Sequence, residues 1–132
     1  MNRVIEILLY TLKAGTGDEF HKIMHEISVP LHTSIGMDVV TYGNSLHDQD
    51  AYYLIRSYDN LDHLNSSQDA FYNSEEWRSG PRMDIIERIN TSLRFVVSLS
   101  PDAIEGLRRS GMQEATTEFL RINSSTIGTN IS

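Results

Sequence analysis

Two charged residues interrupt apolar stretches of the sequence, where an ionised side chain needs a partner. Glu6 lies within the apolar run Val4–Tyr10, and Arg56 lies within the run Ala51–Tyr58. Burying a lone charge is costly unless an opposite charge neutralises it. We therefore expect Glu6 and Arg56 to pair, with Arg94 as a competing partner. The pair is either a structural ion pair or a site in which Arg56 anchors an anionic substrate group and Glu6 orients it.

Three histidines, His21, His25 and His32, are spaced at i, i+4 and i+11. On a helix this spacing places them at the boundary between the apolar face and solvent. His21 and His25 have the spacing to share a metal ion, but no Asp or Glu joins the stripe, so we expect no metal site. His32 follows Pro30 near the end of the helix and is a candidate catalytic acid or base. The alternative is a histidine at the rim of a cleft with no chemical role.

Aromatic side chains are candidates for the walls of a ligand pocket between helices and sheet. The expected ligand-binding residues are Tyr10, Tyr72 and Trp77, and the alternative is that they are ordinary core residues. Arg82 is a further candidate contact, with local pairing as its alternative. A haem would need an axial ligand facing the pocket, for which His63 is the nearest candidate. We expect no bound cofactor.

Length and composition narrow the class of protein. The chain has 132 residues and a formal net charge of −7, which fits one acidic domain and argues against a nucleic-acid binder. The absence of cysteine excludes disulfides, thiolate catalysis and iron–sulfur ligation. The N-terminal residues lack the pattern of a signal peptide, so none is expected, and no apolar stretch reaches the roughly 18 residues that a membrane span needs. A cytoplasmic protein that binds neither membrane nor nucleic acid is expected.

The hydrophobic pattern predicts the elements that must position these residues. Thr16 and Glu19 have the spacing of a capping box, and Pro30 predicts that the first helix kinks or ends near Ser28 or Val29. The order β-α-β-β-α-β predicts a ferredoxin-like α+β domain. The predicted strands cover residues 4–13, 37–46, 51–58 and 91–99, and the predicted helices lie within residues 16–31 and 60–89.

The first strand is apolar on both faces, although the two helices can cover only one face of the sheet. We expect Val4, Leu8 and Tyr10 to lie on the uncovered face. An exposed apolar face of this size favours a homodimer in which two sheets pack against each other. The expected domain spans residues 1–100. Residues 101–132 are expected to form an extension that is helical at first and flexible towards its end.

Several short strings, taken in order, resemble the NIPSNAP family over roughly residues 4–99. Each string is weak alone, and the ordered set is fairly specific. The resemblance implies a dimeric α+β barrel. The strings are Glu6-x-x-x-Tyr10-Thr11-Leu12-Lys13-x-Gly15, Asp18-Glu19-Phe20, Gly36-Met37, Leu54-Ile55-Arg56-Ser57-Tyr58, Ala70-Phe71-Tyr72, Trp77 and Arg82.

Two hypotheses for function remain open. The first is a dimeric protein that binds a small organic, anionic ligand in a cleft between helices and sheet. The wider barrel superfamily implies a cofactor-independent monooxygenase, cyclase or isomerase as its activity. The second is a non-catalytic dimeric interaction module that uses the C-terminal extension for docking. An enclosed pocket with convergent polar groups favours the first hypothesis, and a cleft filled by Phe71, Tyr72 and Trp77 favours the second.

Overall fold

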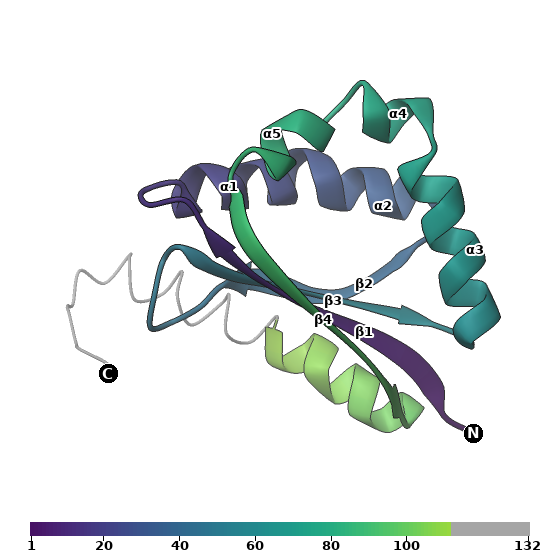
Figure 1. The fold of residues 1–132 in the computed structure, drawn as a ribbon. Helices are drawn as coiled ribbons and strands as arrows, with labels where there is room; N and C mark the ends of the chain where they lie inside the picture. Colours follow the sequence, from purple (N-terminus) through teal and green to yellow (C-terminus); the bar gives the residue numbers. More distant parts are fainter. Residues whose placement is uncertain (112–132) are drawn as a thin grey trace.

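Residues 1–111, which the computed structural model describes, form a four-stranded antiparallel sheet with helices α1 to α5 on one face (Figure 1). The strand order is β2-β3-β1-β4. This arrangement is the predicted ferredoxin-like α+β fold. The elements are β1 (Arg3–Leu12), α1 (Gly17–Ile23), η1 (Met24–Ser28), α2 (Val29–Ile35), β2 (Asp38–Asn44), β3 (Ala51–Tyr58), α3 (Leu61–Tyr72), α4 (Glu75–Arg78), α5 (Arg82–Ile86) and β4 (Ile89–Leu99).

The register of the sheet brings the charged residues of three strands together. β1 and β3 are the central strands, and Glu6 lies directly opposite Arg56. On the other side of β1, Arg94 of β4 lies opposite Leu8. Because alternate residues share a face, Glu6, Arg56 and Arg94 all point to the same side of the sheet.

That side is the one covered by the helices, which corrects the predicted assignment of the faces. Leu8 and Leu12 of β1 belong to the main core with Phe20 and Phe71, and Val4 and Tyr10 pack against this core. Alternation shows which residues share a face, but it does not show which face the helices cover. The second face is nevertheless apolar, as expected, with Leu9, Leu93, Phe95 and Val97 between 39% and 54% exposed.

The first helix is interrupted near the predicted position but does not end there, because the π-helical turn η1 runs to Ser28 and α2 continues from Val29 past Pro30. Within η1 the backbone widens so that the N–H of Val29 bonds to the carbonyl of Met24, five residues earlier. Proline removes a backbone donor and crowds the preceding turn, and a wider turn accommodates both effects. Helix α2 then continues to Ile35 and ends at Gly36, which has a left-handed backbone with φ of 92°.

Helix α1 lacks the predicted capping box. The Thr16 hydroxyl donates to the carbonyl of Lys13 instead. The carboxylate of Asp50, in the β2–β3 hairpin, accepts from the backbone N–H of Gly15 at 2.9 Å and of Gly17 at 2.8 Å. It thereby provides acceptors for backbone N–H groups at the start of the helix.

The part of the extension that the structure describes is helical over residues 101–111. This helix lies beneath the sheet, on the face away from α1 to α5 (Figure 1, light green). The predicted continuation of the helix and the predicted flexible tail lie outside the described residues. Among residues 1–111 no helix is long and apolar enough to cross a membrane.

Candidate functional site

The centre of the candidate site is a buried ion pair between Glu6 and Arg56. Each side chain is 1% exposed. Arg56 donates from Nε to Glu6 Oε1 at 2.9 Å, and its Nη2 lies 2.7 Å from the same oxygen. The predicted pairing is therefore present. It lies between sheet and helices, away from the open face of the sheet.

The second oxygen of Glu6 is also fully engaged. Arg94 donates from Nε to Oε2 at 2.6 Å, and Gln68 of α3 donates to the same oxygen at 2.7 Å. Arg94 is therefore an additional partner, where the sequence suggested a competing one. Burial alone would raise the pKa of Glu6, but the charge of Arg56 and the hydrogen bonds from Arg94 and Gln68 lower it below the ordinary value. Glu6 is therefore ionised at neutral pH and forms ion pairs with two cations, Arg56 and Arg94.

His32 completes the inner side of the cluster as a neutral, buried side chain. Its Nδ1 lies 2.7 Å from the carbonyl of Ser28, an acceptor, so Nδ1 carries the proton. The lone pair of Nε2 then accepts from Arg56 Nη1 at 2.9 Å. Burial lowers the pKa of His32 to about 4, with the charge of Arg56 acting in the same direction. His32 is thus not at a rim, and in this arrangement it orients Arg56.

The outer side of the cluster is formed by Tyr72 and Arg94. Arg56 Nη1 donates to the hydroxyl of Tyr72 at 2.9 Å. Tyr72 is 37% exposed, and the side chain of Arg94 is 46% exposed although its Nε is fixed to Glu6. We call these two residues the rim of the cluster. They are the places where the buried charges reach solvent.

The space expected to hold a ligand between helices and sheet is filled by aromatic rings. Phe71 is fully buried, with its ring 4.2 Å from that of His32 and 5.2 Å from that of Trp77. Trp77 also packs against Tyr72, with ring centroids 5.3 Å apart. Tyr10 packs edge-on against Phe20 in the core, and burial raises the pKa of its hydroxyl. Trp77 is therefore a core residue behind the rim.

The remaining candidates form no described hydrogen bond with Glu6 or Arg56, although the ring of His63 packs edge-on against that of Tyr58 at 5.7 Å. Arg82 is exposed on α5, where its Nη1 lies 3.8 Å from the sulfur of Met83. His63 accepts from the backbone N–H of Asp59. His21 and His25 stack on each other, and each uses Nδ1 to bond a tyrosine hydroxyl. Within residues 1–111 no group of three or more His, Cys, Asp and Glu side chains could hold a metal ion.

A hollow of about 750 Å³ lies on the opposite side of the sheet. Its lining combines apolar residues of the open face with the β2–β3 hairpin. Among these residues are Ile7, Leu9, Tyr53, Ile55, Leu93 and His47. The hollow shares no lining residue with the rim.

Two residues of the cluster, Tyr58 and Gln68, were not among the predicted site residues. Tyr58 donates to Glu6 Oε1 at 3.3 Å, and Gln68 donates both to Glu6 and to the Tyr58 hydroxyl. Two signals in the sequence point to them. Tyr58 follows Arg56 by two residues and so shares its face of the strand. Gln68 lies four residues after Leu64, on the buried stripe of α3.

Comparisons with known proteins place the fold among solved NIPSNAP-family structures. A NIPSNAP family protein of unknown function from Agrobacterium tumefaciens is similar with a TM-score of 0.67 and 19% identity, covering 74% of this chain and 88% of that one. A NIPSNAP-like domain protein from Burkholderia xenovorans gives 0.66 and 12%, covering 72% and 83%. A putative antibiotic biosynthesis monooxygenase from Nitrosomonas europaea gives 0.56 and 10%, covering 71% and 95%. No protein-family model and no curated protein matches the chain.

Proposed function

We propose that this protein, which has the fold of NIPSNAP-family structures, binds a small organic anion at the rim of the Glu6–Arg56 cluster. One observation carries the proposal, namely that Arg94 is a cation fixed to a buried carboxylate through Nε while nearly half of its side chain stays exposed. A guanidinium group held in this way presents its terminal nitrogens to a carboxylate or phenolate. The hydroxyl of Tyr72 is a second polar contact at the same rim.

Charge balance supports an anionic ligand. Glu6 contributes one negative charge, Arg56 and Arg94 contribute two positive charges, and neutral His32 contributes none, so the cluster keeps one net positive charge. The chain as a whole carries a net charge of −7. A ligand anion would neutralise this local excess of positive charge. Arg56 supports the rim from within and does not itself reach the ligand.

The described cluster is better suited to binding than to proton transfer at neutral pH. The pKa of His32 is about 4, burial raises that of Tyr58 to about 12, and Arg56, Arg94 and Gln68 hold that of Glu6 below its ordinary value. An efficient general base has a pKa near the working pH. An oxygenase or isomerase activity would therefore depend on the reactivity of the ligand itself. We keep that activity, and a cytoplasmic location, as predictions.

Replacing Arg94 by alanine is expected to weaken the binding of an aromatic carboxylate by about tenfold, because a charge-assisted hydrogen bond is lost. Benzoate is a suitable probe, and its binding is measured by the shift of the Gln68 side-chain amide in NMR titrations. Benzamide, a neutral molecule of similar shape, should bind both proteins weakly. Arg82→Ala, which removes an exposed arginine outside the cluster, should leave benzoate binding unchanged. Equal binding to the wild type and Arg94→Ala would disprove the role of the rim.

The open face of the sheet supports the second proposal, a homodimer formed through this face. Leu9, Leu93, Phe95 and Val97 lie on adjacent strands β1 and β4, and all are substantially exposed. Apolar sheet faces of this kind are buried by packing against another sheet. The filled space between helices and sheet also favours the alternative function, a non-catalytic dimeric module. The benzoate titration distinguishes the two functions.

Phe95→Glu is expected to raise the dissociation constant of the dimer by at least about tenfold, because it removes a buried ring and would desolvate a charge. Sedimentation velocity at a series of protomer concentrations measures this constant. Ser92→Glu is the matched control, since it adds the same charge to the same strand on the opposite face. A dimer that is equally stable in Phe95→Glu would place the interface elsewhere.

A further inference from the structure

The helix of residues 101–111 covers part of the open sheet face. Ile104 is 1% exposed and forms a small core with Ile5 of β1 and Val40 of β2. Leu99 and Leu107 pack against the same core. The side of the helix that carries Ile104 and Leu107 is therefore seated on the sheet, on the face opposite the Glu6–Arg56 cluster.

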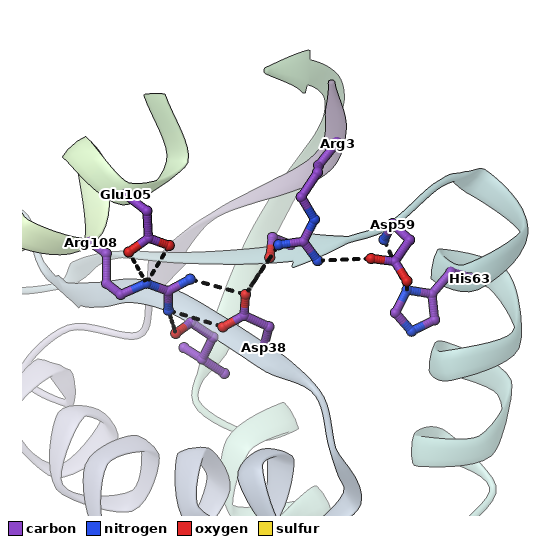
Figure 2. A network of polar contacts seen from close by, with 8 residues as sticks. Arg3, Asp38, Asp59, His63, Glu105 and Arg108 are labelled. Carbon is purple, nitrogen blue, oxygen red and sulfur yellow. Dashed lines mark hydrogen bonds and ion pairs between the residues drawn. The ribbon is translucent and has the colours of Figure 1, made fainter. Parts of the chain in front are cut away.

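An ion-pair network fixes this helix at the edge of the sheet (Figure 2). Arg108 contacts both carboxylate oxygens of Asp38, each at 3.0 Å, and also the carbonyl of Val39 at 3.3 Å. Glu105 lies 3.2 Å from Arg108 Nε, and Arg3 lies 3.8 Å from Asp38. We call the contact between Arg108 and Asp38 the latch.

The end of the described helix fits closely against the sheet as well. A Cβ atom at Gly111 would lie 2.3 Å from Oγ1 of Thr41, so only glycine allows this approach. Thr41 in turn contacts the hydroxyl of Tyr53, which lines the hollow of the open face. The helix therefore reaches the border of the uncovered region.

The latched helix and a second sheet cannot occupy the same area. Two sheets that pack face to face lie about 10 Å apart. A helix with its side chains is itself about 10 Å in diameter. A second copy therefore cannot bring its sheet into contact wherever helix 101–111 lies. Of the sheet face that residues 1–111 leave open, the region around Leu9, Leu93 and Phe95 remains available to it.

We propose that helix 101–111 competes with a second copy of this chain for the open sheet face. In the latched state the second copy packs only on the uncovered region, and release of the helix opens the full face to it. The occupant is a second copy because the uncovered surface is an antiparallel, uncharged, apolar sheet face, and two such faces bury each other in sheet-on-sheet packing. This inference rests on the proposed homodimer.

Sedimentation velocity of latch variants tests the competition at matched protomer concentrations. Arg108→Gln removes the latch charge, and Leu107→Ser weakens the apolar seat without touching the latch. Each variant is expected to lower the dissociation constant of the dimer, and loss of the partly exposed Arg108–Asp38 pair should lower it by about fivefold. Arg109→Gln, which changes the neighbouring exposed arginine, should leave the constant unchanged. Hydrogen exchange of the amides of residues 103–108 reports release of the helix independently.

The outcomes separate failure of this inference from failure of the proposed dimer. In one outcome the wild type forms a dimer whose association is unchanged or weaker in the Arg108→Gln/Leu107→Ser double variant. That result overturns the competition but agrees with the proposed homodimer. A wild-type monomer that dimerises in the double variant supports the competition. If the wild type and all the variants are monomers, both the proposed homodimer and the competition are overturned. Unchanged exchange of residues 103–108 in the double variant also overturns the inference, because the named contacts would then not hold the helix.

Discussion

Replacing Glu6 by glutamine is expected to lower the free energy of unfolding by about 3–5 kcal/mol, the cost of leaving a buried charge without its partner. Glu6 is the only anion of the described cluster, and it holds Arg56 at 2.7 Å and Arg94 at 2.6 Å. Glutamine keeps the shape of the side chain but leaves two guanidinium groups facing each other. Urea unfolding at pH 7, followed by circular dichroism at fixed protomer concentration, measures the loss.

A double-mutant cycle separates the charge from the packing. Arg56→Met should also destabilise the protein strongly, because Glu6 then keeps only the half-exposed Arg94. Combining Glu6→Gln with Arg56→Met should cost clearly less than the sum of the two single changes, since only the single variants leave a buried charge without its partner. Glu19→Gln, on the surface of α1, is the matched control. A loss below about 1 kcal/mol for Glu6→Gln, typical of a surface pair, would contradict the buried pairing.

The expected loss of stability also changes how an Arg56 variant is interpreted. From the sequence, loss of binding with an intact fold would mark Arg56 as a ligand anchor, whereas precipitation would mark it as structural. In the structure Arg56 is buried and donates to Glu6, His32 and Tyr72. Arg94 is therefore the residue on which a binding role can be tested without removing the centre of the cluster.

The sequence predicted the sheet well because alternation along a strand is a local property. The strand of residues 51–58 was predicted with its exact bounds, and the pairing of Glu6 with Arg56 followed from two charges in apolar runs. The assignment of faces failed because it depends on where the helices pack. Leu8 and Leu12 face the helices, while Ile7 and Leu9 lie on the other face.

The position of His32 could not be predicted, because the π-helical turn shifts the buried side of the helix. A regular helix predicts Ile27 and Leu31 in the core after Met24. The wider turn of η1 instead buries Ser28 and His32, and leaves Ile27 47% exposed. A shift of one residue rotates the helix by about 100°. It moves His32 from the predicted boundary into contact with Arg56.

Acidification is expected to destabilise the protein in a range set by His32. The pKa of His32 is about 4 in the folded protein and 6.5 in its ordinary state. Above pH 6.5 the residue is neutral in both states, and its contribution to stability is complete. As the pH falls from 6.5 towards 4, the unfolded chain binds a proton that the folded protein does not, so stability is lost. Linkage gives a loss of about 2 kcal/mol between pH 7 and pH 5.

The comparison of wild type with His32→Gln isolates this contribution, because glutamine offers Arg56 an acceptor that does not titrate in this range. The variant should lose less free energy of unfolding than the wild type between pH 7 and pH 5. The pKa of His21 is also lowered, by partial burial and by His25, and its contribution remains in both proteins. His47→Gln, on the exposed hairpin, should keep the wild-type pH dependence. Identical pH profiles for wild type and His32→Gln would show that His32 is protonated while buried, and its hydrogen bond from Arg56 would then be wrongly assigned.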